Sequence, residues 1–266
     1  MSNTATVLAF DFGASSGRAI RAVYDGQNLT YEEIHRFENV PIEKGGHLFW
    51  DVETLLKEIH TAIQKAGTFD SLGFDTWGVD FGLLDTDGHL LANPVHYRDA
   101  RTNGKPEQAA ARMPAEELYA HTGNQIMAIN TLFQLLALQE QEPELLQKAA
   151  QILFMPDLFA ALLGAEPVCE RSIASTSQML DPRTGQWSRE VLAAYGLNAN
   201  RFAPLVASGT VTGTLANGAK IIAVAGHDTQ CASAAMPTTR PLFAPSRDAE
   251  GTARRKSLML TASPCT

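Results

Sequence analysis

The chain has 266 residues, of which 45% are hydrophobic and 19% charged, and it carries a formal net charge of −8. This length can bury a large core, and the acidic balance argues against a surface built for nucleic acid. Three widely separated cysteines without a C-x-x-C pair suit a reducing compartment and offer no zinc site or disulfide framework. No signal peptide and no run of roughly 18 apolar residues is found. We therefore expect a cytoplasmic protein that acts on a small molecule, with no nucleic-acid or membrane partner.

The first part of the chain alternates apolar and polar side chains, which is typical of strands with one buried face. The pattern predicts strands over residues 6–13, 17–26 and 29–39. Asp25-Gly26 separates the second strand from the third and is a common hairpin turn.

Residues 51–67 (DVETLLKEIHTAIQKAG) predict an amphipathic helix, because their apolar side chains recur every three or four positions. Asp51 can cap the N-terminus of this helix and Gly67 can end it. Two short strands follow within residues 71–88. Strands, a helix and a further strand in this order indicate a mixed sheet covered by helices.

The middle of the chain is predicted to be helical by the same criterion. The predicted helices cover residues 130–141, 143–154 and 155–164, and Pro143 separates the first two. Residues 218–228 (GAKIIAVAGHD) then return to a buried strand that ends on a His-Asp pair.

The composition changes from residue 237 onward, where four prolines occur without a convincing strand pattern. Basic residues outnumber acidic ones there, with Arg240, Arg247, Arg254, Arg255 and Lys256 against Asp248 and Glu250. We expect residues 237–266 to be disordered or to come from a shifted reading frame.

The turn between the first two strands, in DFGASSGR (11–18), has the chemistry of a phosphate site. Its glycines allow close approach to the backbone, and its N–H and hydroxyl donors can bind an anion without a lysine. Asp11 would lie near that phosphate and would need a Mg²⁺ ion or its water between them. A plain hairpin turn explains these residues about equally well, because short glycine patterns often match by chance.

Two further segments carry polar groups next to strands. In GFDTWGVDFGLLD, Gly78 could let a polar ligand approach the backbone beside the wall of Trp77. A core tryptophan between two turn or surface aspartates, Asp75 and Asp80, is the simpler interpretation. In HYRDARTNG (96–104), dense donors and acceptors suit a polyhydroxylated ligand, and a solvated loop with an Arg–Asp pair fits almost as well.

The segment AVAGHDTQ (223–230) places His227, Asp228 and Thr229 directly after a buried strand. Open α/β folds hold ligand groups at such carboxyl ends. A carboxylate there can accept the proton of a sugar hydroxyl while that hydroxyl attacks a phosphoryl group. Taken alone, a His-Asp pair is often only a hydrogen-bonded turn.

In combination these segments resemble the FGGY carbohydrate kinases, whose α/β fold is that of actin and hexokinase, a ribonuclease H-like mixed sheet flanked by helices. DFGASSGR is similar to the family's first phosphate loop and GHDTQ to its catalytic-base motif. GFDTWGVDF, HYRDARTN and NTLFQLLAL lie between them in the expected order, and the resemblance covers residues 6–236. DFGASSGR, FDTWGVDFGLLD and YRDARTNG are most similar to members that act on L-rhamnulose, whereas STSQMLD (175–181) and GHDTQ resemble members that act on L-fuculose.

The resemblance implies a role for each part of the site. ATP phosphates would be bound by the first loop, at Ala14, Ser15, Ser16, Gly17 and Arg18. Asp11 would face a Mg²⁺ ion. The sugar would be bound by Gly78, His227, Asp228 and Thr229, with Asp228 as the catalytic base. The implied reaction transfers the γ-phosphoryl group of ATP to the 1-hydroxyl of L-rhamnulose, giving L-rhamnulose 1-phosphate.

The resemblance also divides the chain into parts. Residues 1–236 would form the N-terminal domain, with the sugar site and the first phosphate loop, and 237–266 an atypical tail. The family's C-terminal nucleotide domain, with its adenine pocket and second phosphate loop, is expected to be absent, which implies impaired phosphorylation by this chain. Besides an L-fuculose kinase, two alternatives stay open. One is a sugar-binding module without catalysis, and the other is an ATPase of the wider actin fold.

Overall fold

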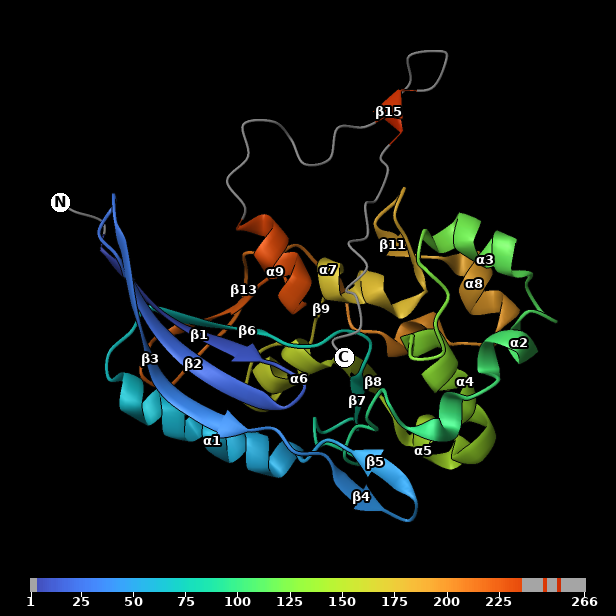
Figure 1. Cartoon of the computed structure of the whole chain (residues 1–266), viewed down its shortest axis with the longest axis horizontal. Helices are drawn as coiled ribbons and strands as arrows, with labels where there is room; N and C mark the ends of the chain where they lie inside the picture. Colours follow the sequence, from blue (N-terminus) through green and yellow to red (C-terminus); the bar gives the residue numbers. More distant parts are fainter. Residues whose placement is uncertain (1–3, 236–245, 248–252, 255–266) are drawn as a thin grey trace.

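A six-stranded mixed sheet lies at one end of the molecule (Figure 1). The structure, a computed structural model, describes residues 4–235 and the short pairs 246–247 and 253–254. In spatial order the strands are β13 (Thr210–Thr214), β14 (Lys220–Ala223), β6 (Ser71–Asp75), β1 (Ala5–Phe12), β2 (Ser16–Tyr24) and β3 (Leu29–Glu38). The central strands β14, β6 and β1 are parallel, and the outer strands pair antiparallel. The predicted mixed sheet is confirmed.

The first three strands follow the alternating pattern of the sequence. Every second side chain of β1 points into the core, and the fully buried ones are Leu8, Phe10 and Phe12. Between β2 and β3 the backbone of Gly26 has a φ of 97°, and the carboxylate of Asp25 accepts two backbone N–H groups of the same turn. The predicted Asp-Gly hairpin is therefore confirmed.

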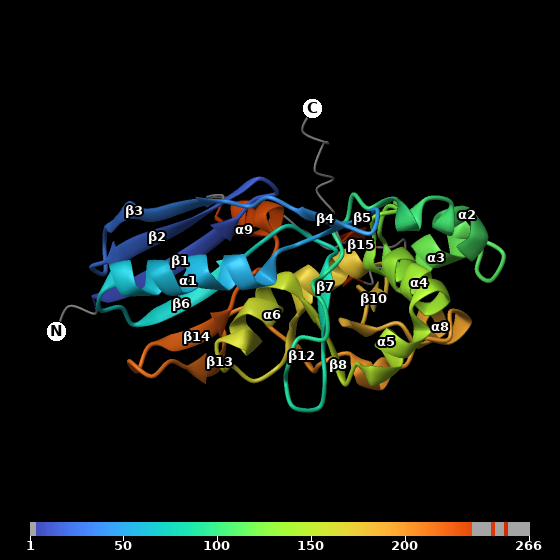
Figure 2. The same cartoon turned by 90° about the horizontal axis from the view of Figure 1, so that it is seen from below.

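Two helices pack against the same face of the sheet, α1 (Val52–Ala66) and α6 (Met155–Leu162) (Figure 2). The carboxylate of Asp51 accepts the N–H of Thr54 at 3.1 Å and so caps α1, while Gly67 ends it with a φ of 65°. The predicted helix is confirmed together with both of its end signals.

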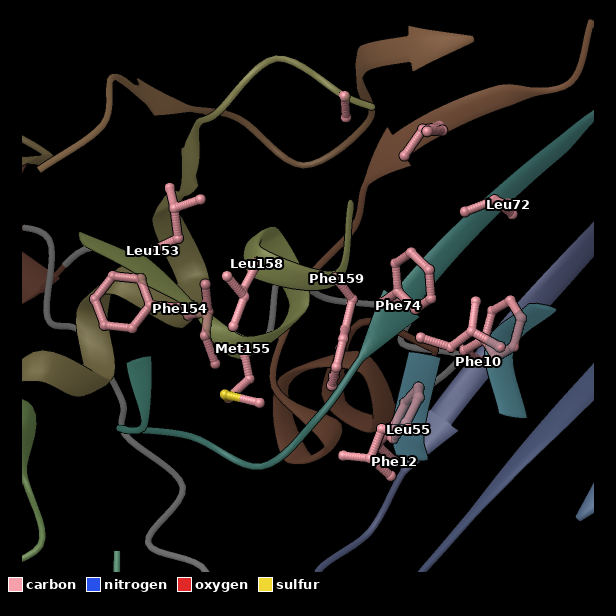
Figure 3. Packing of buried hydrophobic residues seen from close by; sticks show 14 of the residues in the cluster. Phe10, Phe12, Leu55, Leu72, Phe74, Leu153, Phe154, Met155, Leu158 and Phe159 are labelled. Atoms are coloured by element: carbon pink, nitrogen blue, oxygen red, sulfur yellow. The ribbon is translucent and has the colours of Figure 1, made fainter. Parts of the chain in front are cut away.

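Aromatic side chains join the sheet to α6, as Figure 3 shows. Phe12 of β1 stacks on Phe159 of α6 with ring centroids 4.9 Å apart, and Phe10 stacks on Phe74 of β6 at the same distance. Leu55 of α1 is fully buried in this cluster. Because β1 and β6 carry these rings, the core fixes the two strands whose ends form the site described below.

A helical region with its own core occupies the other end of the molecule (Figure 2). Its helices are α2 (Lys105–Ala109), α3 (Ala115–Thr122), α4 (Thr131–Gln141), α5 (Pro143–Lys148) and α8 (Arg189–Ala194). The apolar side chains of α4 supply much of this core, including Leu132, Phe133 and Leu135, which are fully buried.

Two predicted elements differ in the structure. The predicted helix over 143–154 is wrong in its second half, where β8 (Gln151–Phe154) pairs antiparallel with β7 (Phe81–Leu84). Short apolar runs do not distinguish helix from strand, and pairing with a distant partner decides. The predicted strand over 218–228 is also too long, because β14 ends at Ala223 and a helix begins at Asp228.

The remaining elements are short. They are β4 (Ile42–Lys44), β5 (His47–Phe49), η1 (Ala100–Thr102), β9 (Cys169–Glu170), α7 (Arg171–Ala174), η2 (Ser175–Ser177), β10 (Leu180–Asp181), β11 (Gln186–Trp187), η3 (Ala199–Arg201), β12 (Leu205–Val206) and α9 (Asp228–Ala234). β15 (Ser246–Arg247) pairs with β16 (Ala253–Arg254). The rest of the predicted tail, 237–266, lies outside the described residues. Among the described helices none is both long and apolar enough to cross a membrane.

Candidate active site

Three aspartates meet where β1, β6 and β14 end. Asp11 and Asp75 are direct neighbours in the parallel register of β1 and β6. The N–H of Asp228 donates to the carbonyl of Thr76 at 3.0 Å, and the N–H of Thr76 donates to the carbonyl of Gly226 at 3.0 Å. The sheet thus brings together residues that are more than 200 positions apart, at the edge where such folds bind ligands.

Asp75 is the member of this group that sequence reasoning missed, because it was interpreted as a turn or surface residue. Burial, together with the neighbouring carboxylates of Asp11 and Asp228, raises the pKa of Asp75 to about 7 against the opposing effect of Arg18. Perturbed carboxyl groups of this kind are common at functional sites. The signal that could have identified Asp75 is its place at the end of a strand next to β1.

The pKa of Asp75 predicts a pH dependence of stability. The folded pKa of about 7 lies above the ordinary 3.8. Between about pH 4 and 7 the folded chain therefore keeps a proton on Asp75 that the unfolded chain has already lost. The free energy of unfolding should therefore fall as pH rises through this window, by up to about 1.4 kcal/mol per pH unit for this group. The free energy of unfolding can be measured with urea at several pH values across this window. It should fall less steeply with pH for Asp75→Asn than for wild type. Equal slopes would contradict the prediction.

The first loop is held in place by Asn39, which directly follows β3. The side-chain amide of Asn39, which is buried, donates to the carbonyl of Gly13 at 2.9 Å, and its backbone N–H donates to the carbonyl of Ser15 at 3.0 Å. Within the described part of the chain the backbone N–H groups of Ala14 and Ser15 have no hydrogen-bond partner. Two free donors in a fixed turn are suited to an anion.

Three residues of the loop, Ser16, Gly17 and Arg18, lie in β2 rather than in the turn itself. Arg18 pairs with Asp11 at 2.7 Å, and its side chain remains 44% exposed. Gly17 is buried with a φ outside the left-handed region, and a Cβ there would lie 2.3 Å from the ring of Phe37. The glycine is therefore required by packing against Phe37, which is a different reason from the backbone access that the sequence suggested.

Gly78 and His227 come together across the sheet edge. A Cβ on Gly78 would lie 3.2 Å from the imidazole Cδ2 of His227 and 3.2 Å from the methyl group of Thr176. Burial lowers the pKa of His227, while the nearby Asp228 carboxylate opposes this shift. The structure thus places two of the predicted sugar-binding residues in contact.

The carboxylate of Asp228 is half-exposed at the start of α9. Its Oδ1 accepts the N–H and the hydroxyl of Thr229 at 2.5 and 3.0 Å, and lies 3.3 Å from Nε2 of His227. Among the described residues no hydrogen bond reaches its Oδ2. One carboxylate oxygen is fixed, and the other is available to a ligand.

Asp80 lies in the turn next to the site and is buried, so its interpretation as a surface residue is wrong. Its Oδ2 accepts the indole N–H groups of Trp50 at 2.6 Å and Trp77 at 3.0 Å, and Gln134 donates to its Oδ1 at 2.8 Å. The two indoles stack at 3.8 Å. Burial raises the pKa of Asp80 to about 7, and these hydrogen bonds oppose the shift. Trp77 is a core residue, as the simpler interpretation held.

The segment 96–104 is mostly used for structure. His96 stacks on Trp50 with centroids 4.0 Å apart, and the buried Asp99 accepts the backbone N–H groups of Leu48 and Arg101. Arg98 lies over the ring of its neighbour Tyr97 and is exposed. His96 and Asp99, two of the polar residues that suggested a polyhydroxylated ligand, therefore already contact other parts of the protein.

Comparison with known proteins places this arrangement in a family. The N-terminal domain of the FGGY family of carbohydrate kinases matches residues 6–234. The chain belongs to the FGGY carbohydrate kinases. The predicted resemblance is confirmed, and the match spans all the residues from which the site is built.

Two rhamnulokinases are similar to this FGGY chain in sequence. The one from Bacteroides thetaiotaomicron is 41% identical over 250 residues, covering 89% of this chain and 52% of that protein. The one from an Enterobacter species is 39% identical over 240 residues, covering 86% and 49%. The chain spans about half the length of the curated relatives it matches.

Solved structures agree on the fold. A xylulose kinase from Rhodospirillum rubrum superposes with a TM-score of 0.74 at 18% identity, covering 89% of this chain and 52% of that one. A gluconate kinase from Lactobacillus acidophilus gives 0.73 at 17% identity, covering 83% and 47%. The predicted actin/hexokinase-like α/β fold is confirmed.

Proposed function

We propose that this chain forms the sugar-binding domain of a ketose kinase, which transfers the γ-phosphoryl group of ATP to the 1-hydroxyl of L-rhamnulose. The carrying observation is the meeting of Asp228, Gly78 and the Asp11–Arg18 loop at one sheet edge. The similarity to two rhamnulokinases supports the choice of sugar. In this proposal residues 1–236 are one domain, and 237–266 lie outside it.

Asp228 would act as the general base. The contacts from Thr229 and His227 hold its Oδ1, so Oδ2 can accept the proton of the sugar hydroxyl as that oxygen attacks phosphorus. Gly78, His227 and Thr229 would bind the other sugar hydroxyls. The chain's main contribution is alignment, because phosphoryl transfer depends on holding the attacking oxygen in line.

ATP phosphates would be bound by the loop from Ala14 to Arg18, whose free N–H groups and guanidinium suit an anion. Asp11 would face Mg²⁺, and the oxygen donors at this edge fit such an ion. Among the described residues, three ligand atoms close enough for one metal occur only at the partly exposed Asp85 with the exposed Asp87 and His89. Proteins usually hold Mg²⁺ with one or two carboxylates together with substrate phosphates, and Asp11 would supply such a carboxylate. When bound, the ion would neutralise charge on the transferring group.

The choice of sugar is tested by binding. In calorimetry on the 266-residue chain, we expect L-rhamnulose to bind more tightly than L-fuculose or D-xylulose. Tightest binding of L-fuculose would instead favour an L-fuculose kinase. A chain that binds none of the three would contradict the proposed function.

The type of reaction is tested by measuring ADP release with and without L-rhamnulose. The assay uses a longer polypeptide, in which this domain is joined to the part of its relatives that the chain does not cover. Sugar-dependent release supports the kinase. Sugar binding without release would indicate a binding module, and release without sugar would indicate an ATPase.

A further inference from the structure

The backbone turn at Gly78–Val79 is strained. Val79 has a φ of 68°, in the left-handed region that a β-branched residue rarely adopts. The N–H of Asp80 donates to the carbonyl of Gly78 at 2.9 Å, which closes a three-residue turn around Val79. A γ-turn with a positive φ at its centre is rare and costly. The surrounding contacts must therefore impose this conformation.

Two threonines from distant parts of the chain hold the turn. The hydroxyl of Thr176 accepts the N–H of Val79 at 3.0 Å, and the hydroxyl of Thr131 donates to the carbonyl of Val79 at 2.6 Å. Both polar groups of this one residue are thus satisfied by side chains. Thr176 lies 97 residues further along the chain.

Thr176 faces the turn with both its hydroxyl and its methyl group. Its hydroxyl also donates to the carbonyl of Ile173 at 2.7 Å, which fixes the rotamer. Its methyl group is 3.2 Å from where a Cβ of Gly78 would lie, and His227 is equally close to that point. Gly78 is therefore confined between Thr176 and His227.

The segment that carries Thr176 also contacts the segment after β14, which leads to His227 and Asp228. The buried carboxylate of Glu170 caps α7 by accepting the N–H groups of Ser172 and Ile173, and it also faces the N–H of Gly226 at 3.4 Å. Residues 170–176 thus connect the Gly78–Val79 turn to Gly226, two residues before the proposed base.

We propose that Thr176 is a positioning residue for the ketose site. It holds the Gly78–Val79 turn in its strained form and so keeps the backbone of Gly78 against His227. The inference rests on the proposed function, in which the ketose binds beside Gly78 and His227. No sugar contact by Thr176 itself is required.

The test combines ketose binding with amide hydrogen exchange on the 266-residue chain. Thr176→Val removes the hydroxyl at nearly constant size. We expect it to weaken L-rhamnulose binding about tenfold, the effect of one lost hydrogen bond, and to speed exchange in residues 76–80. Thr176→Ser keeps the hydroxyl and should restore both readouts to within about twofold of wild type. Thr176→Ala gives the same test as Thr176→Val if the valine variant does not fold.

Thr212→Val is the matched control. Thr212 is a buried threonine of β13 whose hydroxyl bonds the carbonyl of Ile221 at 3.3 Å, away from the site. It should leave both binding and exchange in 76–80 unchanged. A Thr176→Val variant that binds L-rhamnulose as wild type does would overturn this inference alone. A wild-type chain that binds no ketose would overturn the proposed function, and this assignment with it.

Discussion

Asp228→Asn should lower kcat for ATP-dependent phosphorylation of L-rhamnulose by about 100-fold or more, which is the lower range for loss of a general base. The substitution keeps the size of the side chain, and its amide oxygen can still accept the two donors of Thr229. It removes the basic oxygen that is otherwise free in the site. Sugar affinity should change much less than kcat, because the base acts in the transition state.

The assay uses a longer polypeptide, in which this domain is joined to the part of its relatives that the chain does not cover. Asp51→Asn is a suitable control, since Asp51 only caps α1 and asparagine caps a helix about equally well. Its kcat should match that of wild type. Near-normal kcat for Asp228→Asn at saturating substrates would exclude Asp228 as the base.

Asp80→Ala should reduce the free energy of unfolding by about 3 kcal/mol or more. The change leaves four donors without their acceptor inside the protein, namely the indole N–H groups of Trp50 and Trp77, the backbone N–H of Tyr97 and the amide of Gln134. An unpaired buried donor costs far more than an ordinary hydrogen bond contributes. Urea unfolding at fixed pH measures the effect.

Asp85→Ala provides the comparison at a partly exposed position. Asp85 also accepts backbone N–H groups, from Asp87 and His89, but water can replace it there. We expect a loss of less than about 1 kcal/mol for this variant. If Asp80→Ala cost no more than Asp85→Ala, the buried network would not be what holds the two tryptophans.

Local sequence signals determined much of this protein. The alternation in β1 to β3, the Asp25-Gly26 hairpin and the capped helix α1 were predicted correctly from residues close together in the chain. The motifs also identified the family and placed His227 and Asp228 after a buried strand. These features depend on interactions within a few residues, which a sequence displays directly.

Only the tertiary structure determined the different environments of Asp75 and Asp80. The two residues flank Trp77 and look alike in sequence, yet one lies beside Asp11 and the other is buried under Trp50. The parallel register of β6 with β1 determines the first, and the return of the chain from β5 determines the second. The same holds for β8, which looked helical until β7 was available as a partner.

Thr176 is the clearest case of information that the sequence alone could not give. Its partner Val79 is 97 residues away, and no local pattern connects them. The strained turn at Val79 exists only because side chains from two distant helical segments hold it. Local propensity determined most helices and strands of this chain. The positions of the site residues depend instead on strand register and long-range hydrogen bonds, because these form only when the helices and strands pack together.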